Sequence, residues 1–126
     1  MRIDAYTHFI PETYFAKMLE GDHKDIGKRV REIPCIHDLD ERRKIVDMFD
    51  DYAQILSYPM PPPERMYKPA QLEDMIRVLN DGFAEIVAKH PDRLMGMGTV
   101  PLQDPGMAVA ELDRSVRELG FRGVEL

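Results

Sequence analysis

The stretch Arg2-Ile3-Asp4-Ala5-Tyr6-Thr7-His8 is predicted to be the first strand of the protein, and three alternate residues in it carry the chemistry. Side chains two positions apart on a strand point to the same face. Asp4, Tyr6 and His8 are therefore expected on one face, with His8 at the carboxyl end. Imidazole is a good ligand for zinc and related divalent ions, so His8 is the candidate metal ligand.

Each of these three residues also has a second interpretation. A phenol binds a metal well only after losing its proton, which a nearby cation favours. Tyr6 is therefore either a ligand or a residue that contacts substrate or fills space. Asp4 is either the carboxylate that orients His8 or a buried polar residue at the floor of the fold. His8 itself could be a hydrogen-bonded structural histidine.

Strand and helix patterns alternate along the chain, which is typical of an α/β protein with a parallel sheet. Three more strands are predicted, at Ala53–Tyr58, Leu94–Val100 and Phe121–Leu126. Helices are predicted at Pro11–Leu19, from an N-cap at Asp40 to about Asp51, at Pro69–Lys89 and after Asp104. The chain thus contains four β/α steps, and we treat residues 1–126 as one domain.

Smaller expectations concern the segments between these elements. Gly21 and Gly27 are expected to break the first helix, and Val30–Ile36 to form a short extended piece. Pro59–Pro63 contains four prolines and is expected to be a stiff loop. The last helix is expected to carry Ala108, Leu112, Val116 and Leu119 on one face.

Residues that follow parallel strands of a β/α barrel meet at one edge, where active sites lie. Ser57, at the end of the second strand, therefore joins Tyr6 there as a candidate substrate contact. Arg29 and Arg31 lie in the variable stretch expected to cover this edge, and a guanidinium grips a carboxylate with two hydrogen bonds. These residues favour a small carboxylate as the substrate.

Composition excludes several classes of partner. The net charge is −6 without a basic run, which argues against nucleic acid as a partner. No apolar run approaches the roughly 20 residues of a membrane span, and no signal peptide is expected. Cys35 is the only cysteine, so an internal disulfide is impossible and a reducing cytoplasm is the expected compartment. No Gly-x-Ser-x-Gly motif supports a serine nucleophile.

The opening Ile-Asp-Ala-Tyr-Thr-His-Phe-Ile-Pro resembles proteins of the amidohydrolase superfamily, of the aminocarboxymuconate-semialdehyde decarboxylase type, whose usual form is Ile-Asp-x-His-x-His-x-x-Pro. Further matching stretches extend the resemblance over essentially the whole chain; they are Asp38–Arg43, Gln54–Ser57, Lys89–Leu94, Val100–Asp104 and Leu119–Val124. The chain departs from the usual form at Tyr6, which stands where the first histidine is expected.

The resemblance implies the first half of a TIM barrel and a metal-dependent hydrolase or nonoxidative decarboxylase of a small carboxylic acid. Zinc is the usual ion of such proteins, and manganese is known. The resemblance assigns metal binding to His8 and to the position of Tyr6. The remaining ligands of the family lie on later strands, beyond Leu126, so the isolated chain is expected to be inactive.

The alternative function is a non-catalytic half barrel, an oligomerising or regulatory module in which Tyr6 marks a lost metal site. Under either function, the first and last strands are open edges, and open edges pair readily with another chain. A homo-oligomer formed through these edges is therefore expected.

Overall fold

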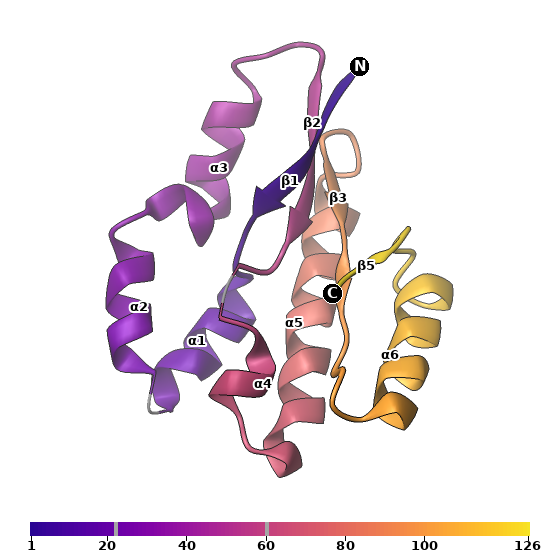
Figure 1. The fold of residues 1–126 in the computed structure, drawn as a ribbon. Helices are drawn as coiled ribbons and strands as arrows, with labels where there is room; N and C mark the ends of the chain where they lie inside the picture. The colour runs from indigo at the N-terminus through magenta and orange to yellow at the C-terminus, as the bar shows by residue number, and fades with distance from the viewer. Residues whose placement is uncertain (22, 60) are drawn as a thin grey trace.

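The computed structural model describes residues 1–21, 23–59 and 61–126 and contains two sets of parallel strands (Figure 1). Strands β1 (Arg2–His8), β2 (Tyr52–Ser57) and β3 (Leu94–Gly96) form one sheet in the order β1-β2-β3. Strands β4 (Gly98–Thr99) and β5 (Val124–Glu125) form a second pair. The predicted parallel α/β architecture is confirmed.

Helices connect these strands and cover one side of the sheet. They are α1 (Glu12–Glu20), α2 (Lys24–Arg31), α3 (Leu39–Val46), α4 (Pro63–Met66), α5 (Pro69–Lys89) and α6 (Pro105–Arg117), with a 3₁₀ turn, η1, at Pro34–Ile36. In Figure 1 the strands of the larger sheet run downward from the N-terminus, with α5 behind them and α3 and α6 on either side. In the described ranges, no helix combines the length and the low polarity that crossing a bilayer requires.

The long helix α5 has the predicted bounds and supplies the centre of the core. Its apolar stripe includes Leu79 and Phe83, both fully buried, because residues four apart share one helix face. These side chains pack in one cluster with Leu56 of β2 and Leu94 of β3. The core therefore lies between the sheet and its helices, and none of the helices in the described ranges covers the opposite face of the sheet (Figure 1).

The prediction for residues 24–36 is wrong, because this segment is mainly helical. Lys24–Arg31 forms α2, and Gly27 lies inside it instead of breaking a helix. The reason is amphipathicity: Ile26 and Val30, four residues apart, both pack against the core. The expected extended piece at Val30–Ile36 is the end of α2 followed by η1.

Helix α3 begins earlier and ends earlier than predicted. Asp38, not Asp40, is the N-cap, and its Oδ1 accepts a hydrogen bond of 3.1 Å from the backbone N–H of Glu41. This Asp-x-x-Glu pattern resembles a capping box. The helix stops at Val46, five residues before the predicted end.

The expected loop at residues 59–63 includes Met60, which lies outside the described residues, and Pro63 already begins α4.

The third predicted strand is split into β3 and β4, which belong to different sheets. The backbone N–H of Met97 donates to the carbonyl of Leu56 in β2, whereas that of Gly98 donates to Gly123 before β5. The hydrogen-bonding partner therefore changes between two consecutive residues. The last predicted strand shortens to Val124–Glu125, and Phe121 fills the core instead.

The apolar face predicted for α6 is mostly on the surface, although Leu119, just after the helix, packs against the core. Glu111 and Ser115 are the buried residues of α6, whereas Leu112 and Val116 are exposed. Glu111 faces α5 because its carboxylate accepts a hydrogen bond of 2.7 Å from the buried amide of Asn80. The polar face of the helix therefore packs inward, and its apolar stripe remains on the surface.

Candidate functional site

The end of β1 is shaped by an irregularity in its pairing with β2. Asp4 pairs with Gln54 and Thr7 pairs with Leu56, so β1 uses three steps where β2 uses two. Paired residues of a parallel sheet point to the same side, and Gln54 shares a face with Leu56. Asp4 and Thr7 therefore share the helix-covered face. This single extra residue is a β-bulge.

The bulge contradicts the expectation that Asp4 lies on the same face as His8. The Asp4 carboxylate accepts hydrogen bonds from the Tyr52 hydroxyl, at 3.0 Å, and from the backbone N–H of Tyr6, at 3.2 Å. The Tyr52 hydroxyl in turn accepts from the Gln54 side-chain amide at 2.9 Å. Asp4 thus belongs to a polar network on the helix side, which is close to the alternative interpretation as a buried structural residue.

Tyr6 and His8 lie together at the carboxyl end of β1, as predicted. Their ring centroids are 4.8 Å apart and the planes meet at 73°, so one ring edge rests on the other face. The Tyr6 side chain is 77% exposed and His8 is half-buried. His8 pairs with Ser57, which alternates with the core residue Leu56, so the His8 ring lies on the side of the sheet away from the core, where it contacts the ring of Tyr6.

Ser57 is brought directly to His8, because the two residues are register partners in the β1–β2 ladder. The Ser57 Oγ lies 3.1 Å from His8 Nδ1 and 3.3 Å from the Thr7 carbonyl oxygen. The carbonyl of Ser57 accepts the backbone N–H of Phe9 at 2.9 Å. Ser57 is only 4% exposed, so its hydroxyl is held firmly beneath the histidine ring.

Arg42 of α3 also reaches this strand end, a role that was not predicted from the sequence. Its guanidinium donates to the carbonyl of His8, to that of Cys35 at 2.8 Å and to the Gln54 side chain at 3.0 Å. Burial lowers the pKa of this guanidinium, and charge interactions with Cys35, Tyr52 and Asp4 oppose that shift. The available signal was helical spacing, since Arg42 lies four residues before the fully buried Val46.

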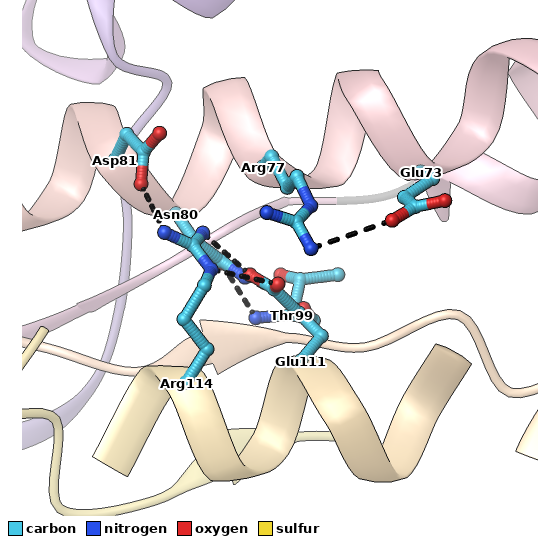
Figure 2. Close-up of polar contacts among 7 residues, drawn as sticks. All are labelled: Glu73, Arg77, Asn80, Asp81, Thr99, Glu111 and Arg114. Carbon is cyan, nitrogen blue, oxygen red and sulfur yellow. Dashed lines mark hydrogen bonds and ion pairs between the residues drawn. The ribbon is translucent and has the colours of Figure 1, made fainter. Parts of the chain in front are cut away.

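A second network fixes the backbone of β4, at the neighbouring strand end (Figure 2). The buried side chain of Asn80 donates to the Thr99 carbonyl at 2.9 Å and accepts from the Thr99 N–H at 2.8 Å. The same amide also donates a hydrogen bond to the Glu111 carboxylate, which accepts another from the guanidinium of Arg114. The Arg114 guanidinium forms an ion pair of 2.6 Å with Asp81 as well. Hydrogen bonding to Glu111 raises the pKa of Arg114, so this cation stays charged.

The structure does not place Arg29 and Arg31 at the carboxyl end of β1. Both are exposed on α2, which packs against α1 and η1.

A hollow of about 510 Å³ lies on the helix-covered side, between the starts of α1 and α3 and the last turns of α5. Its lining does not include Tyr6, His8 or Ser57, so this hollow is separate from the candidate site.

His8 fits a divalent metal as one ligand, since its ring stands at an accessible strand end with Nδ1 bonded behind it. Within the described residues, no group of three or more His, Cys, Asp and Glu side chains could hold a metal ion. Tyr6 is the only other predicted ligand beside His8. The described part of the chain therefore does not offer a complete metal site by itself.

Comparison with known proteins places residues 3–126 in a family model described as amidohydrolase. The gamma-resorcylate decarboxylase of Rhodococcus jostii (strain RHA1) is 37% identical over 126 residues, which cover 97% of this chain and 37% of the relative. The 2-amino-3-carboxymuconate-6-semialdehyde decarboxylase of Dictyostelium discoideum is 28% identical over 143 residues, which cover all of this chain and 40% of the relative.

A solved structure agrees with these sequence matches. The dihydroxybenzoic acid decarboxylase of Polaromonas sp. JS666, with bound manganese and the inhibitor 2-nitroresorcinol, superimposes with a TM-score of 0.75 at 33% identity. The match covers 98% of this chain and 37% of that structure. The chain spans little more than a third of the length of these relatives. The solved neighbours are TIM barrels, so the predicted fold class is confirmed.

Proposed function

The chain belongs to the amidohydrolase family, and from that premise we propose that it supplies the first β/α units of a metal-dependent decarboxylase acting on a small aromatic carboxylate. The observation that carries the proposal is the placement of His8, at the carboxyl end of β1 on the open face of the sheet. Active sites of β/α barrels lie at these strand ends. A hydrolase of the same family is the other reaction consistent with this site.

Each residue of the site has a specific part in this proposal. His8 holds the ion through its ring, and Tyr6, in contact with that ring, binds either the ion or the substrate. Zinc and manganese are the candidate ions, and a manganese-bound relative supports the second. When bound, a divalent ion polarises the oxygens of a carboxylate substrate. Substrate binding by Arg29 and Arg31 stays a prediction.

Metal titration of the chain tests the proposal. We expect Zn²⁺ and Mn²⁺ to bind the 126-residue chain weakly, because four ligands make a complete zinc site and the residues that the structure describes offer His8 and at most Tyr6. His8→Ala should abolish this binding, whereas His90→Ala, which removes a histidine at the end of α5, should leave it unchanged. Equal metal affinity in the parent and the His8→Ala variant would overturn the proposal.

The position of Tyr6 gives a second, independent variant. Tyr6→His restores two imidazoles one residue apart on an accessible strand end, so the affinity for Zn²⁺ should rise by about tenfold or more. Calorimetry or competition with a chromogenic chelator measures the change. A Tyr6→His variant that binds zinc no better than the parent would show that this position does not face the ion.

The second candidate function is the non-catalytic half barrel. The specific observation in its favour is Tyr6 itself, which is 77% exposed and hydrogen-bonds through its backbone to Asp4. Under this function, His8→Ala changes the free energy of unfolding at most, and neither ion binds the parent chain. The two functions thus differ on one measurement, the metal affinity of the parent.

A further inference from the structure

The contact between Ser57 and His8 determines which nitrogen of the histidine is available. A metal takes the ring nitrogen that carries no proton, and the tautomer is set by the hydrogen bond of the other nitrogen. In the structure, Nδ1 of His8 is the bonded nitrogen and Ser57 Oγ is its partner, at 3.1 Å. The question is therefore which of these two atoms donates the hydrogen.

The second neighbour of Ser57 Oγ, the Thr7 carbonyl, determines which atom donates. A serine hydroxyl has one hydrogen to donate and can accept through its lone pairs, whereas a carbonyl oxygen can only accept. Ser57 Oγ lies 3.3 Å from the Thr7 carbonyl and 3.1 Å from His8 Nδ1, and both contacts are hydrogen bonds at once only if the serine hydrogen points to Thr7. The lone pair of Oγ then faces His8, and Nδ1 must carry the hydrogen. Nε2 is left with its lone pair.

We propose that Ser57 is a positioning residue that holds His8 in the Nδ1–H tautomer and presents Nε2 to the open face of the sheet. This refines the expectation that Ser57 contacts substrate: it is 4% exposed, and its hydroxyl has both of its bonds within the protein. The hydrogen bond from the Phe9 N–H to the Ser57 carbonyl also fixes the backbone directly after His8. The value of this tautomer for metal binding rests on the proposed function, but the tautomer itself does not.

The tautomer can be measured without any metal. Long-range ¹H–¹⁵N correlation spectra of the ¹⁵N-histidine-labelled chain, at about two pH units above the ordinary histidine pKa of about 6.5, distinguish the protonated ring nitrogen from the bare one. For His8 we expect a protonated Nδ1 and a bare Nε2. In Ser57→Ala this pattern should be lost, with the shifts moving toward those of a mixture of tautomers. Ser57→Thr, which keeps the hydroxyl, should retain it.

A matched control is Ser115→Ala, which removes a different fully buried serine hydroxyl, one without a hydrogen-bond partner among the described residues. It should leave the His8 pattern unchanged even if it alters stability. A protonated Nε2 on His8 in the parent chain would overturn the proposal, and so would an unchanged Nδ1–H pattern in Ser57→Ala.

Metal titration then separates this proposal from the proposed function. Loss of a hydrogen bond behind a ligating histidine typically weakens metal affinity by about 10–100-fold, so Ser57→Ala should weaken Zn²⁺ binding by about that factor. If His8→Ala leaves the zinc affinity of the parent unchanged, the metal function fails while the tautomer result stands. If His8 binds zinc but shows a protonated Nε2 in the metal-free chain, the positioning role fails alone.

Discussion

At the scale of single residues, the end of β1 is held from both sides of the sheet. The hydroxyl of Ser57 is hydrogen-bonded to the ring of His8 on the open face, and Arg42 donates a hydrogen bond to the backbone carbonyl of His8 from the helix side. Arg42 has no carboxylate among its hydrogen-bond partners in the described structure and instead donates to three oxygens of the protein. A buried cation that satisfies neutral acceptors fixes geometry, and removing it leaves those acceptors unpaired.

Replacing Arg42 should therefore destabilise the fold strongly. Arg42→Met retains the apolar stem of the side chain but leaves the oxygens of His8, Cys35 and Gln54 without their donors. We expect the free energy of unfolding to fall by about 2–4 kcal/mol, since each unsatisfied buried group costs about 1–3 kcal/mol and the losses overlap. Urea denaturation followed by circular dichroism measures the difference.

Arg43→Met is the matched control, one residue further along the same helix. Its guanidinium pairs with Asp47 and Asp92, which are both largely exposed, so the loss of these pairs should matter far less. Equal destabilisation by the two substitutions would show that the bonds of Arg42 to the strand end have no special weight.

At the scale of secondary-structure elements, helix α5 positions the start of α1 by close packing. A Cβ atom added at Gly82 of α5 would lie 2.5 Å from Cβ of Pro11 and 2.9 Å from Oγ1 of Thr13. The neighbouring proline ring is rigid and cannot move aside cheaply. The absence of a side chain at Gly82 thus allows the segment that follows His8 to pass directly over the helix.

This contact reverses the usual effect of replacing a helical glycine. On propensity alone, Gly82→Ala would stabilise the protein by about 1 kcal/mol. Because the added methyl group overlaps Pro11, we expect a net loss of about 1–3 kcal/mol in the free energy of unfolding. Thermal or urea unfolding of the variant checks the sign.

Gly27→Ala in α2 is the comparison. There the added Cβ meets the Cδ2 atom of Leu19, the end of a flexible side chain that can change rotamer. Propensity should largely offset this contact, so Gly27→Ala should be much less destabilising than Gly82→Ala. The opposite ranking would mean that the contact between α5 and the start of α1 is loose.

At the scale of the whole molecule, the core contains ionisable hydroxyl groups. Tyr14 of α1 and Tyr58, which follows β2, are both buried, with rings 5.2 Å apart in an edge-on arrangement. Burial raises the pKa of Tyr58 to about 12 and also raises the pKa of Tyr14. The folded state therefore holds these protons at a pH where the unfolded chain, with tyrosine pKa values of about 10, releases them.

Stability should consequently fall at alkaline pH. The contribution of the protonated hydroxyl is fully present below pH about 10 and is lost as the pH rises toward about 12. For Tyr58 alone, a rise of about two pKa units corresponds to about 2–3 kcal/mol. Urea unfolding at pH 8 and pH 11 should show this loss in the parent chain and a smaller loss in Tyr58→Phe. Equal losses in the two proteins would contradict the assignment to Tyr58.

Exposed apolar side chains on β1 and α6 affect how whole molecules associate. Ile3 of β1 is 52% exposed, and Val109, Leu112 and Val116 form an exposed apolar stripe on α6. Open strand edges and apolar stripes favour association with a further chain. We therefore expect the 126-residue chain to self-associate in a concentration-dependent way, as light scattering after size-exclusion chromatography would detect.

A charge at the strand edge should reduce this association. Ile3→Lys places a lysine on β1, a common protection of edge strands, and should shift the chain toward the monomer. Ile45→Lys, at a similarly exposed position on α3, is the control and should have little effect. A parent chain that is monomeric at every concentration would contradict the prediction.

The sequence by itself determined the features that depend on local periodicity. The bounds of α5, the start of a helix after Asp104 and the first two parallel strands follow from patterns a few residues long, and those patterns hold in the structure. The pairing of Tyr6 with His8 was likewise predictable, since alternation along a strand brings them together.

Only the tertiary structure decided the features that depend on distant partners. The bulge that turns Asp4 away from His8 exists because β1 and β2 differ by one residue in register, which neither strand shows alone. Glu111 of α6 faces inward because it accepts a hydrogen bond from the amide of Asn80. The role of Arg42 depends on acceptors that lie on three other segments. Buried polar groups must find partners wherever the chain supplies them, and sequence spacing cannot reveal those partners.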